Sequence, residues 1–132
     1  MMDRKKIREM VVDLLEKAMD LDPAIITDNA SLQGDLGIES IDLLDVQFRI
    51  ERMFNIQFDR DELFPDDIFT DKDTCVKNGM VTEQGRIELM SAIPHADWAS
   101  IKDPLPAKEI KNIFTVCTLV NFIESKLSSP VV

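Results

Sequence analysis

Ser40 is the side chain whose type and position are best suited to chemistry. It follows a turn that contains Gly34 and Gly37, and it stands where a helical pattern begins. A serine at the start of a helix presents its hydroxyl to solvent, because no preceding helical turn covers it. Its oxygen can also accept a hydrogen bond from an amide of the first turn, which makes Ser40 a candidate N-cap. A modifying enzyme could therefore reach this hydroxyl.

Catalysis by Ser40 itself is poorly supported by the sequence. A serine nucleophile needs an adjacent base and a group that stabilises the oxyanion, and the sole histidine, His95, lies far along the chain. The segment also lacks the Gly-x-Ser-x-Gly pattern of a nucleophile elbow. A serine that accepts a prosthetic group needs none of these features, since a transferase supplies the chemistry. We therefore expect no catalytic residues, and a hydrolase that uses Ser40 is the least favoured alternative.

Amphipathic segments must position this serine. Apolar residues recur at steps of three and four over residues 3–20, and this spacing predicts a first helix. A long loop rich in turn residues follows, and a second helix should run from Ser40 to about Phe54. Thr115 is a candidate cap for a last helix that continues to Leu127. The residues predicted to end that helix are Ser128, Ser129 and Pro130.

The stretch of about 61–104 differs in composition from the predicted helices, and we interpret it as an insertion. Acidic clusters, glycines and prolines divide it into short pieces. Residues 82–93 could form one helix with Ile87, Met90 and Ile93 on a shared face. Trp98 could anchor the insertion to the helices or form an exposed contact.

The limits of the insertion allow two interpretations. Residues 106–111 resemble a short helix with a proline in its first turn, and this helix would follow the insertion. Arg60 to Leu63 could instead begin the third helix, and the extra material would then start near Phe64. We expect a single domain over residues 1–132, with its core at about 1–60 and 105–128.

Composition and charge restrict the classes of partner. The chain carries 15 basic and 25 acidic residues, so its formal net charge is -10. Such a surface repels nucleic-acid phosphates and anionic lipids, and it is attracted to basic patches on other proteins. No segment resembles a signal peptide or a membrane span. We therefore expect a cytoplasmic monomer that binds neither nucleic acid nor membranes.

The cysteines do not indicate a metal site or a disulfide framework. Cys75 and Cys117 lie far apart, without the spacing of zinc ligands, and no second pair of cysteines or histidines could complete a site. We predict that both are free thiols.

A known family signature matches the segment around Ser40. Residues 35–42 read Asp-Leu-Gly-Ile-Glu-Ser-Ile-Asp, which resembles the acyl carrier protein signature, usually Asp-x-Gly-x-Asp-Ser-Leu. The resemblance returns at the first helix and near the C-terminus, and it covers roughly two-thirds of the chain. It implies an all-α, up-and-down four-helix bundle with the insertion between helices 2 and 3.

The resemblance also implies a cofactor and a function. Ser40 would carry 4'-phosphopantetheine, attached covalently from coenzyme A by a phosphopantetheinyl transferase. Acyl intermediates of fatty-acid, lipid or polyketide-type biosynthesis would travel as thioesters on this arm. Two alternatives remain open: an aminoacyl or peptidyl carrier with the same arm, and an unmodified helical adaptor that binds a partner through the insertion.

In the family, acidic residues of the second helix meet basic patches on the transferase and on acyl-loading ligases and synthases. Glu39 replaces the commoner aspartate and keeps its charge, while Arg49 and Arg52 depart from a uniformly acidic stripe. The arginines suggest a dedicated partner, although Arg49 has the spacing of an ordinary ion pair with Asp45. The predicted partner-binding residues are Asp35, Glu39, Ile41, Asp42, Asp45 and Arg49.

The acyl cargo is expected to lie between helices. The residues predicted to line its pocket are Leu36, Leu44, Phe48, Ile50 and Val120. For Phe48, a position in the core is the simplest expectation.

Overall fold

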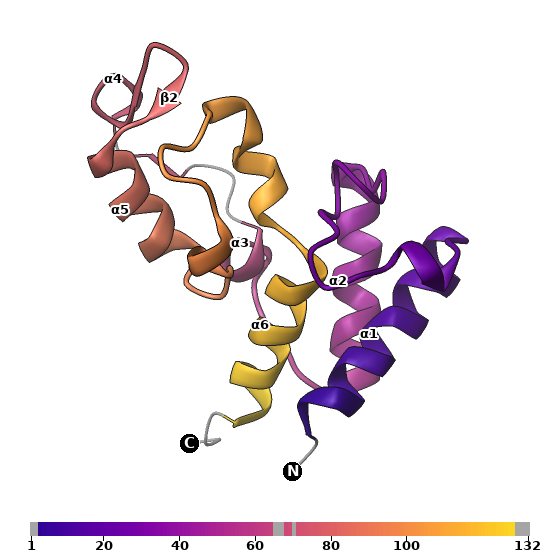
Figure 1. The fold of residues 1–132 in the computed structure, drawn as a ribbon. Helices are drawn as coiled ribbons and strands as arrows, with labels where there is room; N and C mark the ends of the chain where they lie inside the picture. The colour runs from indigo at the N-terminus through magenta and orange to yellow at the C-terminus, as the bar shows by residue number, and fades with distance from the viewer. Residues whose placement is uncertain (1–2, 65–67, 70, 129–132) are drawn as a thin grey trace.

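Three long helices form the frame of the protein. The computed structural model describes residues 3–64, 68–69 and 71–128 (Figure 1). Helix α1 (Arg4–Met19) contacts both α2 (Ser40–Phe54) and α6 (Val116–Ser128). The short helices η1 (Pro23–Ile25) and α3 (Arg60–Leu63) lie in the connections. The predicted helical bundle is confirmed.

The helix ends follow from local side chains. Asp3 is the N-cap of α1, and its carboxylate accepts a hydrogen bond from the amide of Lys6 at 2.8 Å. Asp20 and Asn55 follow α1 and α2 in the left-handed conformation, which asparagine and aspartate tolerate better than most residues. The predicted ends of these helices are therefore confirmed, whereas Ser129 and Pro130 lie outside the described residues. No helix in the described ranges is long and apolar enough to cross a membrane.

One hydrophobic core joins the long helices. Its fully buried side chains include Leu15 of α1, Ile50 of α2 and Leu119 of α6. Leu63 of α3 and the following Phe64 also belong to this core. Helix α3 therefore packs with the bundle, while the limits of the insertion stay a prediction.

The segment between α3 and α6, which we call the extra segment, has its own secondary structure and its own hydrophobic cluster. A two-stranded antiparallel sheet pairs Val76 with Val81, and the sequence patterns did not indicate it. A second cluster of buried residues includes Leu89, Ile93 and Ile113. The elements of this segment are α4 (Lys72–Cys75), β1 (Val76–Lys77), β2 (Met80–Val81), α5 (Glu83–Ala92), η2 (Trp98–Ser100) and η3 (Ala107–Ile113).

Helix α5 forms where it was predicted but buries a different face. Ile87 is 55% exposed and Met90 is also exposed, whereas Ile93 is buried, so the face that the three residues were predicted to share is not the buried face of the helix. Gly85 and Leu89 are buried instead. A Cβ at Gly85 would collide with the carbonyl of Cys75. The missing side chain therefore lets α4 approach α5 closely, and this contact determines which face of α5 is buried.

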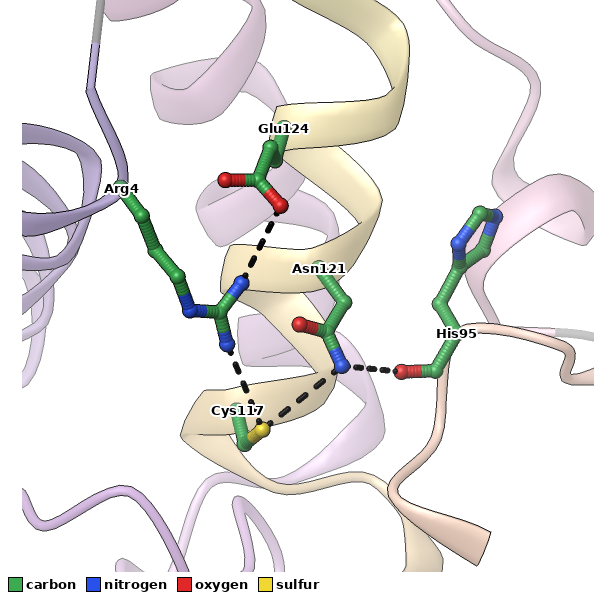
Figure 2. Close-up of polar contacts among 5 residues, drawn as sticks. All are labelled: Arg4, His95, Cys117, Asn121 and Glu124. Atoms are coloured by element: carbon green, nitrogen blue, oxygen red, sulfur yellow. Dashed lines mark hydrogen bonds and ion pairs between the residues drawn. The ribbon is translucent and has the colours of Figure 1, made fainter.

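Helix α6 holds α1 on one side and the extra segment on the other (Figure 2). Arg4 of α1 pairs with Glu124 at 3.4 Å. From the opposite side, Asn121 donates a hydrogen bond from Nδ2 to the carbonyl of His95 at 2.8 Å. The His95 ring meets Phe122 edge-on, with centroids 5.2 Å apart. Burial lowers the pKa of His95, and the nearby Lys126 ammonium lowers it further.

Trp98 belongs to the cluster of the extra segment. Its Nε1 donates to the carbonyl of Ile93 at 2.9 Å, and the Arg86 guanidinium lies over its ring. It packs with that cluster and not with the bundle core. Of its two predicted roles, neither an anchor on the helices nor a fully exposed contact describes this position.

The cysteines are free, as predicted. Cys75 is buried and donates its thiol proton to the Glu88 carboxylate at 2.9 Å, while Cys117 is half-buried. Burial and the Glu88 carboxylate raise the pKa of the Cys75 thiol.

Candidate functional site

Ser40 is exposed and is the first residue of α2. The N-cap is Glu39, so the predicted capping role of Ser40 is wrong. The reason is a capping box in which the Asp42 carboxylate accepts a hydrogen bond from the amide of Glu39 at 3.1 Å. Because the neighbouring acids form this cap, the Ser40 hydroxyl is left for other chemistry.

A tight loop presents Ser40. Gly37 has φ +69°, a left-handed conformation that glycine adopts without steric cost. Leu36 and Ile38 on either side of it are buried, and the Ile38 amide donates to the carbonyl of Leu32 at 2.9 Å. The loop is therefore fixed only two residues before Ser40.

Asp35 stabilises the same loop through a reciprocal pair of hydrogen bonds. Its carboxylate accepts from the amide of Ser31 at 2.8 Å, and the Ser31 hydroxyl accepts from the amide of Asp35 at 2.9 Å. Ser31 is buried, so its amide needs this partner. The acid that opens the motif thus has a structural role within the chain.

The loop is also joined to the beginning of α6. The amides of Val116 and Cys117 donate to the carbonyls of Ala30 and Asp28, at 3.1 and 2.9 Å. The amide of Thr118 donates to the Thr115 hydroxyl at 3.3 Å, which confirms Thr115 as the cap of α6. The free amides at the start of α6 are therefore used to hold the loop before Ser40.

The last turn of the extra segment approaches this loop closely at Gly34. A Cβ built at Gly34 would lie 2.5 Å from Oδ1 of Asn112 and 2.7 Å from the hydroxyl of Ser31. The absence of a side chain at Gly34 therefore allows η3 to lie against the segment that carries the motif.

The outer face of α2 combines apolar and charged side chains. Ile41 is 76% exposed, and the exposed Asp45 and Arg49 form an ion pair at 3.0 Å along the helix. The predicted ordinary ion pair is therefore present. Exposed pairs of this kind contribute about 0.3–0.5 kcal/mol. The predicted partner-binding residues Glu39 and Asp42 lie at the N-terminal end of the same helix.

The five residues predicted to line a cargo pocket do not lie together. Leu36, Ile50 and Val120 are buried in the bundle core, whereas Leu44 and Phe48 are 46% and 55% exposed. The prediction is therefore wrong for Leu44 and Phe48, as is the expectation that Phe48 is a core residue. The buried face of α2 is centred on Leu43, Val46, Ile50 and Phe54, and each of the two exposed residues lies outside it.

Ser40 instead borders a different cavity of ≈ 240 Å³. Two cationic side chains, Arg60 and Lys111, lie at this cavity among mainly apolar ones. The sequence patterns did not identify it, because its walls come from four separate parts of the chain. The other lining residues are Leu32, Gln33, Leu43, Phe64, Ile68, Ile110 and Phe114.

Comparisons with known proteins place this loop and helix in a characterised family of sequences. The family model described as "Phosphopantetheine attachment site" matches residues 5–67. The polyketide-8 synthase acyl carrier protein 2 of Streptomyces avermitilis is 34% identical over 62 residues, which are 47% of this chain and 67% of that protein.

Two further relatives are acyl carrier proteins. That of Amoebophilus asiaticus is 33% identical over 57 residues, which are 43% of this chain and 71% of the relative. That of Coprothermobacter proteolyticus is 31% identical over 62 residues, which are 47% of this chain and 76% of the relative. No solved structure matches the chain significantly.

Proposed function

The chain belongs to the acyl carrier protein family, and we propose that it carries acyl groups as thioesters on a 4'-phosphopantetheine arm attached to Ser40. The cofactor of the family is covalent phosphopantetheine. The observation that carries the assignment to Ser40 is the exposure of this residue at the first position of α2, directly after a fixed loop.

The surroundings of Ser40 fit a phosphodiester. The first turn of a helix has amides without helical partners, and its dipole favours negative charge. Arg60 and Lys111 add positive charge at the neighbouring cavity, while Glu39 and Asp42 work against the anion. The arm, once bound, supplies the thiol that forms a thioester with the acyl group. The chain itself provides the position of that arm and the shape of the surface around it.

The outer face of α2 supports a role in partner binding. Acyl carrier proteins interact with phosphopantetheinyl transferases and synthases, and we propose that Glu39, Asp42 and Ile41 are contacts for these enzymes. Charged residues at the rim of an interface speed the encounter of the two proteins, and an exposed apolar side chain contributes area that the complex buries. The Asp45 carboxylate is shared with Arg49, so a partner must accommodate both signs of charge here.

The role proposed for Asp35 differs from that of the other acidic residues. Since its carboxylate is bonded to the amide of Ser31, we propose that it assists partners mainly by holding the loop before Ser40. The likeness to a polyketide synthase carrier supports an acyl intermediate of polyketide type.

Incubation with coenzyme A and a broad-specificity phosphopantetheinyl transferase tests the proposal. Intact-mass spectrometry should show one added arm on the native chain and on a Ser100→Ala control, because Ser100 is exposed but lies in η2 of the extra segment. The Ser40→Ala variant should gain no mass. An arm on the Ser40→Ala variant would contradict the assignment.

A further inference from the structure

Helix η3 borders a second hollow, on a different face from the cavity beside Ser40. Glu109 and Asn112 line this hollow, and residues three apart share one face of a 3₁₀ helix. Lys111, which lies between them in the sequence, lines the cavity beside Ser40 instead. The two hollows are therefore separate, and we call the second one the polar pocket.

Two parts of the chain enclose the polar pocket. Most of its lining residues come from residues 97–105 and η3 of the extra segment, while Asn29 and Thr115 complete the wall from the bundle. Its volume of ≈ 330 Å³ lies within the roughly 300–1,000 Å³ of sites for small molecules. A ligand bound here would touch both parts of the chain.

The wall formed by residues 97–105 is held in place by contacts within the extra segment. The Arg86 guanidinium of α5 donates hydrogen bonds to the carbonyls of Lys102 and Ile101, at 2.7 and 3.3 Å. It also lies over the Trp98 ring, 5.3 Å from the centroid. Because this backbone is fixed before a ligand arrives, binding requires little further ordering.

The polar pocket carries charges of both signs. Asp97, Lys102 and Glu109 line it. Lys102 pairs with Glu109 at 3.4 Å, and its side chain is 70% exposed. Such an exposed pair contributes little stability, so each partner can exchange it for a charged group of a ligand. The Asp97 carboxylate accepts from the Ser100 hydroxyl at 2.7 Å and has further lone pairs for a ligand.

These charges restrict the class of ligand. Two carboxylates repel a simple anion, and the Lys102 ammonium repels a simple amine. A zwitterion can instead place its ammonium group near Asp97 and Glu109 and its carboxylate near Lys102. The buried side chains of Leu105 and Ile113 add apolar contact area. An α-amino acid with an apolar side chain combines all three features.

We propose that the polar pocket binds a free α-amino acid with an apolar side chain, whose ammonium group pairs with Asp97 and Glu109 and whose carboxylate pairs with Lys102. This site goes beyond the proposed carrier function, because it requires neither Ser40 nor the arm. The bound amino acid links the extra segment to the bundle.

Titration of the unmodified chain with L-leucine, followed by two-dimensional NMR of the backbone amides, tests the site. The amide signals of residues 97–102 and of η3 should shift with one common dissociation constant. Isocaproate lacks the ammonium group of leucine, and isoamylamine lacks its carboxylate. Each analogue should therefore bind at least about tenfold more weakly.

Two variants remove the charges and keep side chains of similar length. Glu109→Gln and Lys102→Gln should each weaken leucine binding about tenfold. Glu83→Gln and Lys108→Gln are the matched controls, because both residues are exposed and do not line the pocket. The control variants should bind leucine as the native chain does.

The site would be overturned if these signals do not shift up to the solubility limit of leucine. Equal binding of leucine and either analogue would also overturn it, as would an equal loss of affinity in the control variants. Each of these results would leave the proposed function intact. Failure to load Ser40 would overturn the proposed function alone, since leucine binding is measured on the unmodified chain.

Discussion

The amide of Leu32 donates a hydrogen bond to the carbonyl of Phe114 at 2.8 Å. Leu32 in turn accepts from the amide of Ile38, two residues before Ser40, while Phe114 packs against both hydrophobic clusters. The loop that presents Ser40 is therefore joined to the point where the extra segment returns to the bundle. A change in the extra segment can reach the site through this contact.

Two phenylalanines of opposite burial test the packing. Phe122 is buried against Phe58 and His95, and Phe122→Ala should lower the free energy of unfolding by about 3–5 kcal/mol. Phe48 is 55% exposed, and Phe48→Ala should change the free energy of unfolding by no more than about 0.5 kcal/mol. Urea unfolding monitored by circular dichroism measures both. A large loss for Phe48→Ala would contradict the exposed position of Phe48.

Asp35 should matter for the loop more than its exposure suggests. Asp35→Ala leaves the buried Ser31 amide without its carboxylate partner, which costs about 1–3 kcal/mol. The rate of arm transfer should also fall, because the loop before Ser40 loosens. Asp45→Ala is the control, since it removes only an exposed ion pair. Equal effects of the two variants on unfolding would argue against this role of Asp35.

His95 should make stability depend on pH. Its pKa in the folded protein lies below the usual 6.5, because of burial and then Lys126. Below pH 6.5 the unfolded chain therefore binds more protons at His95 than the folded chain, and the free energy of unfolding falls as the pH falls through the folded pKa. In His95→Gln this contribution is absent, so the stability difference between native and variant should narrow on acidification. A constant difference from pH 7.5 to about 5 would contradict the lowered pKa.

Ile41 should act in binding and not in folding. At 76% exposure its truncation to alanine should leave the unfolding free energy within about 0.5 kcal/mol of the native value. The rate of arm transfer by the transferase should fall severalfold, because the side chain stands beside Ser40 on the outer face of α2. Ile87→Ala is a matched control, as Ile87 is also exposed but lies on α5. Equal transfer rates in both variants would refute the contact.

The long helices and the position of Ser40 could be predicted because they depend on local patterns. Periodic apolar residues and caps such as Asp3 and Thr115 lie within a few positions of the helix that they begin. The shift of the cap from Ser40 to Glu39 was missed, since serine is the better isolated cap and the sequence does not show that Asp42 completes a capping box.

The cavity could not be predicted, because it depends on contacts between distant segments. Leu43 and Phe64 line it together with Ile110 and Lys111, which lie far from them in the sequence. The buried face of α5 could not be predicted for a similar reason, because it is determined by the close approach of Cys75 to Gly85. Helical periodicity marks an apolar face, but it does not say which face has a neighbour.

The attachment of the arm to Ser40 is tested most directly by tandem mass spectrometry of proteolytic fragments from the loaded chain. The phosphopantetheine should be found on the fragment that contains Ser40 and at that side chain alone. A phosphopantetheine located on any other residue, or a chain that remains unloaded while an acyl carrier protein in the same reaction is converted, would contradict it.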